Sequence, residues 1–288
     1  MKPALLIICV LSICFSQLMA VMDKGNRHQP APVLANPAPE PRARVVAPFH
    51  PRPVMLGQQG QYSPPDFSQL HDVQLRKQAF YDYMLPKIYT ANQEISLERE
   101  WLLWLEEKLL QGDQITADEL NDLAAMEKRY ALSDVGSGGN IYERILTLMP
   151  RVDIVPASLV LAQAAKESGW GTSRFAREGN NFFGIWCFTQ GCGLKPARRD
   201  AGRTHEVAVF DTVEEGVRYY IRTINTHLAY DDLRKIRSAA RSNNEPFNGD
   251  QLATGLLRYS ERGLRYVNEI RSMIRSNKLS RFVREYSA

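Results

Sequence analysis

The segment Val155–Trp186, VPASLVLAQAAKESGWGTSRFAREGNNFFGIW, decides the expected fold. Pro156 suits the first turn of a helix, where its missing N–H would have no partner, and the residues from Ala157 to Lys166 are good helix formers without a breaker. These ten residues leave no wide polar face, which is typical of a buried helix. We therefore predict a core helix that starts near Pro156.

Glu167 stands in the last turn of this helix, because Gly169 can adopt the left-handed conformation that closes a helix. The partial negative charge at a helix C-terminus disfavours a carboxylate, and so do apolar neighbours such as Trp170 and Phe183. Both effects raise the pKa of the carboxyl group, as a general acid at neutral pH requires. The alternative is a partly exposed glutamate that pairs with a nearby basic residue.

Amide and aromatic side chains follow this glutamate closely. Trp170 lies between two glycines, and Asn180 and Asn181 precede the pair Phe182–Phe183. Such a segment can present hydrogen-bonding groups and flat apolar faces to a sugar. The candidate substrate-binding residues here are Trp170, Asn180, Asn181 and Phe183.

The segments LAQAAKESGWGTSRFA (161–176) and GNNFFGIW (179–186) resemble the signature of the bacterial glucosaminidase family of peptidoglycan hydrolases. The resemblance extends to further segments from about Asp66 onward, among them KQAFYDYMLPKIYTANQEI (77–95) and RYSERGLRYVNEI (258–270). It implies a lysozyme-like helical domain with a small β-hairpin lobe, in which Glu167 is the catalytic acid.

A second catalytic group is expected as well, because glycoside hydrolysis usually needs a partner for the acid. Of the acidic residues in the lobe we select Glu206, which the resemblance places on a strand facing the cleft; an exposed strand residue is the alternative. The resemblance also assigns Tyr259 and Tyr266 to a pair of family tyrosines, the second near the acid, although both also suit core packing. A further alternative is that the acetamido oxygen of the substrate attacks.

The N-terminal part of the chain is typical of an exported protein. Lys2 and the apolar run that follows predict a signal peptide over residues 1–20, with an uncleaved membrane anchor as the alternative. Residues 21–65 are rich in proline and predict a disordered tether. Cys187 and Cys192 are the only cysteines after the signal peptide, so we predict a disulfide between them, and no metal or cofactor.

Residues 66–133 predict a helical N-terminal region. Helices are expected over 77–95, where Pro86 predicts a kink or break, and over 97–110. Thr116 and Glu119 form a capping box that starts a third helix. This region could brace the glucosaminidase domain, which we assign to residues 140–288, or form a separate binding module.

Periodicity in the C-terminal half predicts short helices around a small strand. Helices are expected over 141–149, from Thr212 onward, over 231–241, and over 251–274 with an interruption near Gly263; a strand is expected over 205–210. The predicted fold class is therefore mainly α (α+β).

Composition excludes few functions. The chain has 288 residues, a net charge of +4 and a pI near 8.8, which fit an anionic polymer such as a cell wall and are far from a nucleic-acid-binding signature. We predict a periplasmic or cell-envelope endo-β-N-acetylglucosaminidase. Its expected partner is the peptidoglycan glycan strand, and no nucleic-acid partner is expected. The alternatives are a non-catalytic wall-binding or scaffold protein and a lytic transglycosylase or muramidase.

Overall fold

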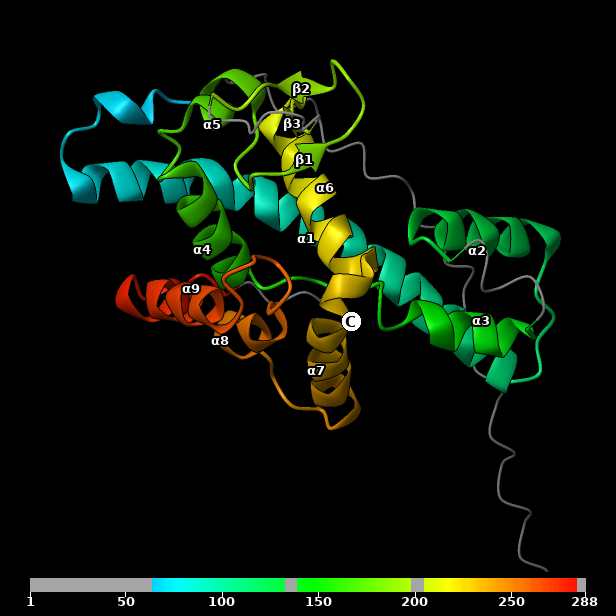
Figure 1. Ribbon diagram of the computed structural model, residues 1–288. Helices are drawn as coiled ribbons and strands as arrows, with labels where there is room; N and C mark the ends of the chain where they lie inside the picture. Colours follow the sequence, from blue (N-terminus) through cyan, green and yellow to red (C-terminus); the bar gives the residue numbers. More distant parts are fainter. Residues whose placement is uncertain (1–63, 133–138, 198–204, 284–288) are drawn as a thin grey trace, which may run out of the picture. The chain divides into compact units, whose positions relative to one another are not determined.

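The computed structural model describes residues 64–132, 139–197 and 205–283 (Figure 1). The predicted signal peptide and nearly all of the predicted tether lie outside these residues. The longer helices are α1 (Val73–Leu110), α2 (Ala117–Arg129), α3 (Ile141–Leu148), α4 (Ala157–Ser168), α6 (Val213–Thr226), α7 (Asp231–Ser242) and α9 (Leu264–Ser276). The described part of the chain is mainly α with one small sheet, as predicted for a lysozyme-like domain.

Helix α1 is a single helix of 38 residues, and the prediction of two helices separated near residue 96 was wrong. Pro86 lies inside it without ending it. A proline in a helix loses one backbone hydrogen bond. However, Met84 and Ile88, on either side of Pro86, are fully buried in the larger hydrophobic cluster, which includes buried residues of α1, α4, α6 and α9 and is called the main core. Burial of this face against α4 and α6 stabilises the helix across the proline.

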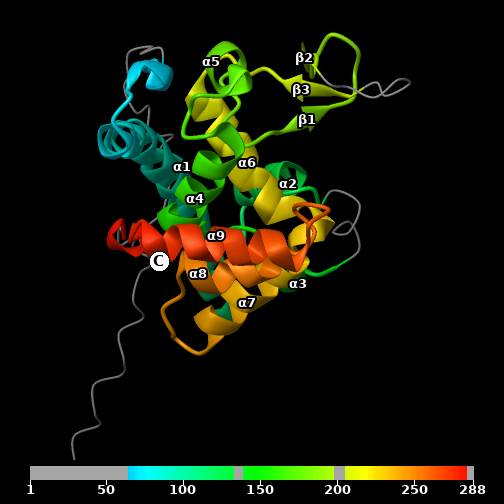
Figure 2. The ribbon, with the colours of Figure 1, turned by 60° about the vertical axis from the view of Figure 1, so that its left-hand side comes forward.

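Helix α4 forms the centre of the main core, as its composition predicts. All of its side chains except Lys166 and Glu167 are buried. It contacts α1, α8 (Gly249–Leu252) and α9, and Figure 2 shows it between α1 and these C-terminal helices. The first half of α1 therefore packs in the same hydrophobic core as α4.

A second hydrophobic cluster surrounds the C-terminal half of α1. There Trp101, Leu102 and Leu105 pack with buried side chains of α2 and α3, namely Leu123, Met126, Ile145 and Leu148. Figure 1 shows α2 and α3 beside this half of α1. Helix α3 begins at the predicted residue, with Asn140 and Glu143 as a capping box, and its buried face lies in this second cluster.

The loop between α3 and α4 is held by a buried group of charges around Asp153. Arg241 of α7 binds this carboxylate through two nitrogen atoms, at 2.8 and 3.1 Å, and Arg99 and Arg237 each lie 3.7 Å from it. Arg99 also donates to the carbonyl groups of Met149 and Val152. Arg237 donates to those of Pro150, Asp153 and Ile154. The start of α4 is thereby tied to both α1 and α7.

The predicted β-lobe is a three-stranded antiparallel sheet. Its strands are β1 (Trp186–Cys187), β2 (Gly193–Leu194) and β3 (Glu206–Ala208), and β3 lies between the other two. The strand expected over 205–210 is thus confirmed but shorter. Short helix α5 (Arg174–Gly179) joins α4 to this lobe and contacts β2.

The C-terminal helices agree with the predicted pattern except in one place. Thr212 caps α6, whose buried face includes Val217, Tyr220 and Ile224. The helix predicted over 251–274 is instead α8, a 3-10 turn over Ala253–Gly255, and α9, so that residues 256–263 form a longer connection than predicted. None of the helices in the described ranges combines the length and apolar character needed to span a membrane.

Candidate active site

Glu167 occupies the last turn of α4, as predicted. Gly169 ends the helix with a φ of 58°, the left-handed conformation that glycine adopts without steric cost. The Glu167 side chain is only partly exposed, and burial raises the pKa of its carboxyl group above the usual value. A hydrogen bond and nearby positive charges oppose this shift without cancelling it.

A chain of hydrogen bonds reaches Glu167 through three helices. The hydroxyl of Tyr220 on α6 donates to Gln163 Oε1, and Gln163 Nε2 donates to the Tyr266 hydroxyl at 3.0 Å. Tyr266, on α9, then donates to Glu167 Oε1 at 2.8 Å. Because Tyr266 accepts from Gln163, its own proton is directed to Glu167, so one carboxyl oxygen is fixed.

The other carboxyl oxygen of Glu167 lies beside an exposed glycine. A Cβ atom built on Gly184 would lie 3.7 Å from Oε2, and the φ of Gly184 is 64°. Asn181 fixes this loop, because its Nδ2 donates to the carbonyl groups of Ile185 and Ala208 while its Oδ1 accepts from the N–H groups of Phe183 and Ile185. The loop can therefore hold a substrate against Oε2 without blocking it.

Stacked aromatic rings support the tyrosine that contacts the acid. Tyr259 and Tyr266 stack with centroids 5.1 Å apart, and Phe183 stacks on Tyr220 at 4.1 Å. The Tyr259 hydroxyl donates to the Phe183 carbonyl at 3.0 Å. These contacts join the loop over residues 181–185 to α9 and α6.

Two other predicted substrate-binding residues make contacts within the fold. Trp170 packs edge-on against Phe80 and Tyr81 of α1, and Asn180 donates to the carbonyl groups of Phe210 and Asp211. The structure therefore brings Tyr266 and the 181–185 loop to Glu167, whereas these contacts of Trp170 and Asn180 join neighbouring segments. Their role in substrate binding stays a prediction.

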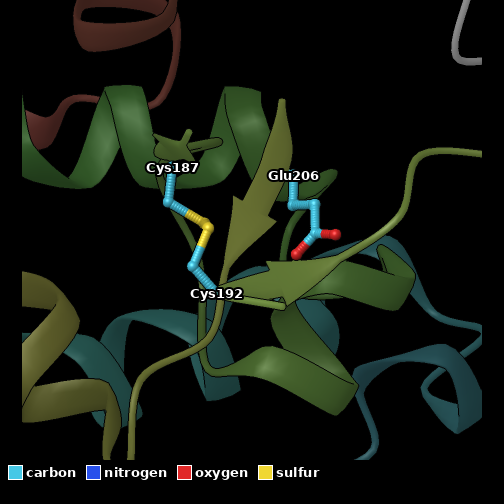
Figure 3. A group of neighbouring side chains, drawn as sticks. All are labelled: Cys187, Cys192 and Glu206. Carbon is cyan, nitrogen blue, oxygen red and sulfur yellow. A yellow bond between two sulfur atoms is a disulfide. The ribbon is translucent and has the colours of Figure 1, made fainter. Parts of the chain in front are cut away.

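Glu206 lies in the β-lobe beside the disulfide. Cys187 and Cys192 form the predicted bond, with Cα atoms 6.2 Å apart, and Figure 3 shows the Glu206 carboxylate next to it. Glu206 is 2% exposed, and its Oε2 accepts the N–H of Gly193 at 2.9 Å. The ligand atoms of Cys187, Cys192 and Glu206 lie within 4.8 Å of one another, but sulfurs bonded to each other are not thiolate ligands for a metal ion.

Sequence reasoning missed a small charge network next to the acid. Glu269 on α9 forms ion pairs with Lys166, at 2.7 Å, and with Arg262. It also missed Gln163, although the spacing of four residues places Gln163 and Glu167 on one face of α4. Nothing in the sequence pairs Glu269 with Lys166, since they lie on different helices and meet only in the fold.

Comparison with known proteins shows the family of this chain. Residues 143–279 match the glucosaminidase family model, described as mannosyl-glycoprotein endo-beta-N-acetylglucosaminidase. The chain is also 36% identical over 205 residues to Protein bax of Escherichia coli, a match that covers 70% of each chain. The chain belongs to the glucosaminidase family, as a Bax-like member. No solved structure matches it.

Family membership gives the site its chemical context. A glucosaminidase domain supports a peptidoglycan-related hydrolase, and the matched residues include the end of α4, the 181–185 loop, the β-lobe and α9. The elements around Glu167 are thus the ones that the family model covers. Helix α1 lies entirely before the matched residues, yet its first half packs on α4.

Proposed function

We propose that this protein is an exported peptidoglycan hydrolase that cleaves the glycan strand as an endo-β-N-acetylglucosaminidase, with Glu167 as the general acid. The observation that carries this proposal is the position of Glu167, half-buried at the end of α4 with one oxygen held by Tyr266 and the other beside exposed Gly184. Burial raises the pKa of Glu167, which favours the protonated form that an acid needs.

The proposed reaction follows from this arrangement. Tyr266 binds Oε1, so the proton resides on Oε2 and is donated to the oxygen that links N-acetylglucosamine to the next N-acetylmuramic acid. The glycosidic bond breaks as that oxygen gains the proton, and water finally adds its hydroxyl to the sugar carbon and returns its other proton to the Glu167 carboxylate. The products are strands that end in a reducing N-acetylglucosamine.

The second catalytic role is assigned to Glu206 as a proposal. A carboxylate could attack the sugar or activate a water, and the substrate acetamido oxygen, aided by the Tyr266 hydroxyl, is the alternative. Glu206 accepts the N–H of Gly193 through Oε2, and this contact holds its carboxylate within the β-lobe that the family model covers. Full activity of Glu206→Gln would leave the acetamido route.

Other features support export and a cell-wall substrate. The Cys187–Cys192 disulfide fits an oxidising compartment, and the predicted signal peptide fits secretion. The family description names a mannosyl-glycoprotein, whereas a glycan strand of peptidoglycan offers the same type of glucosaminide bond. The net charge of +4 favours the anionic wall polymer.

The test is to digest purified peptidoglycan and identify the released fragments by mass spectrometry. We expect fragments with reducing N-acetylglucosamine ends. Reducing N-acetylmuramic acid would instead indicate a muramidase, and anhydro-N-acetylmuramic acid a lytic transglycosylase. Binding without any release would indicate a scaffold protein.

A further inference from the structure

The β-lobe exposes two large aromatic side chains close together in sequence. Trp186 is 55% exposed and Phe188 is 72% exposed. By contrast, aromatic residues of the main core such as Phe80 and Phe182 are fully buried. Exposed aromatic surface that does not serve packing is a common feature of binding sites.

The exposed indole of Trp186 is held in a fixed orientation. It stacks on the imidazole of His205, with centroids 4.3 Å apart and planes at 15°. Trp186 pairs with Val207 across β1 and β3, and the next residue, Cys187, is bonded to Cys192. A side chain that is already ordered loses little entropy when a ligand binds to it.

Trp186 follows closely after the loop that lies beside the acid. Gly184 lies beside Glu167 Oε2 and precedes Trp186 by two residues, and two residues of chain span at most about 7 Å. Asn181 fixes the intervening Ile185 through its N–H and carbonyl groups. The distance from the acid to this aromatic surface is therefore set by a rigid segment.

We propose that Trp186, Phe188 and His205 form an aromatic platform that binds one hexosamine ring of the glycan strand beside the sugars at the scissile bond. Trp186 and Phe188 carry no charge, so the platform suits the apolar face of a pyranose ring rather than the carboxylates of the peptide stems. This inference rests on the proposed function, since it names a further subsite for the same substrate.

The test measures binding without cleavage. The full chain carrying Glu167→Gln is titrated with peptide-free glycan strands prepared from peptidoglycan, and the Kd is compared among variants made in that background. Trp186→Ala is expected to raise the Kd about tenfold, because it removes part of a large apolar contact. Trp186→Phe keeps a flat ring and is expected to stay within about threefold of the parent.

Two further variants keep the test decisive. Tyr142→Ala removes an exposed aromatic ring of α3, outside the β-lobe, and should leave the Kd unchanged. Phe188→Ala alters a side chain that is 72% exposed, so it tests the platform even if Trp186→Ala fails to fold; about a threefold rise in Kd is expected.

The outcomes separate this inference from the proposed function. Unchanged binding in Trp186→Ala and Phe188→Ala, with cleavage intact in the wild type, overturns the platform alone. A wild type that releases no fragments, together with binding that depends on Trp186, overturns the hydrolase proposal and retains the platform.

Discussion

A carboxyl group lies near each end of helix α4, and the two have opposite surroundings. Asp153, shortly before the helix, is 2% exposed and faces three arginines. Glu167, in the last turn, faces the hydroxyl of Tyr266 and the exposed loop at Gly184. Burial opposes ionisation of both groups, but the charges of Arg237, Arg241 and Arg99 hold the pKa of Asp153 below its usual range, whereas burial prevails at Glu167 and raises its pKa.

The difference shows that neighbouring charges, and not burial alone, decide whether a carboxyl group stays ionised and stabilises the fold or keeps a proton that it can donate. Asp153 stays ionised and ties α1 and α7 to the start of α4. Glu167 retains a proton to a higher pH than an ordinary glutamate, which suits proton donation. Substitution of either carboxyl group, or of a neighbour of Glu167, tests one side of this contrast.

The largest effect is expected from Glu167→Gln, which keeps the size of the side chain but removes its acidic proton. We expect hydrolysis of peptidoglycan to fall by a factor of about 10³, because proton donation typically contributes that much. The measurement is the rate of fragment release from purified peptidoglycan, with circular dichroism to verify folding. Turnover near that of the wild type would rule out Glu167 as the acid.

The stability of this variant sharpens the contrast. The folded-state pKa of Glu167 is raised, so the native state binds more protons than the unfolded state above the ordinary glutamate pKa of about 4.3, and stability falls as pH rises through that window. Glu167→Gln lacks this loss. Its free energy of unfolding at neutral pH should equal or exceed that of the wild type.

Asp153→Asn is expected to have the reverse profile, with a large loss of stability. The substitution leaves buried Arg237, which is 0% exposed, without its counter-charge, and breaking such an ion group typically costs about 3 kcal/mol. Urea unfolding at pH 7 measures the loss. Asp250→Asn is the matched control, because Asp250 pairs with the more exposed Arg271 and Arg275 and should cost less than about 1 kcal/mol.

The pH dependence provides a second check on Asp153. Because its folded-state pKa is lowered, its contribution is complete above the unfolded value, about 3.9, and is lost as pH falls toward the lowered value. The difference between wild type and Asp153→Asn should therefore shrink on acidification below about pH 4. A constant difference would mean that Asp153 acts through shape and not through charge.

Much of this contrast could not be predicted from the sequence. The apolar composition of residues 157–166 with Gly169 predicted α4, its end and the raised pKa of Glu167. Asp153, however, reads as an ordinary loop residue, and its three arginines lie on helices far apart in the chain. Charge groups of this kind depend on which helices pack together, a property that periodicity does not specify.

Helix α1 illustrates the same limit on the fold. Local periodicity predicted two helices, over 77–95 and 97–110, and Pro86 predicted a kink or break in the first, because local propensity is all that the sequence displays there. The structure extends one helix through Pro86 and position 96, since its two halves are buried in different hydrophobic clusters. Local signals such as the Thr116 capping box and the Cys187–Cys192 pair were predicted correctly because they depend only on neighbours in sequence.

Tyr266→Phe tests how the acid is held. The variant loses the hydrogen bonds from Tyr266 to Glu167 and from Gln163 to Tyr266, and we expect activity to fall about tenfold. The bond to Glu167 stabilises the ionised carboxylate, so its loss raises the pKa of Glu167 further and moves the alkaline limb of the pH–rate profile to higher pH. Tyr259→Phe is the control: it loses a bond to the Phe183 carbonyl and should leave that limb in place.

The smallest effect is expected from Glu269→Gln, which changes the charge near Glu167 but removes no hydrogen bond to it. Glu269 forms ion pairs with Lys166 and Arg262, and both of these cations favour the ionised form of Glu167. Without Glu269 the two positive charges are unopposed, and the negative charge that raised the pKa of Glu167 is also gone, so that pKa falls. The alkaline limb of the pH–rate profile should therefore move to lower pH, opposite to the change in Tyr266→Phe, while the maximal rate stays within about twofold of the wild type.

Glu261→Gln is the control for the change in net charge. Glu261 is exposed and lies in the same connection as Arg262, so its substitution should not move the alkaline limb. The Tyr266 hydrogen bond lowers the pKa of Glu167 and the Glu269 charge raises it, so removing them should shift the alkaline limb in opposite directions. Shifts in the same direction would mean that the limb reports the pKa of a group other than Glu167.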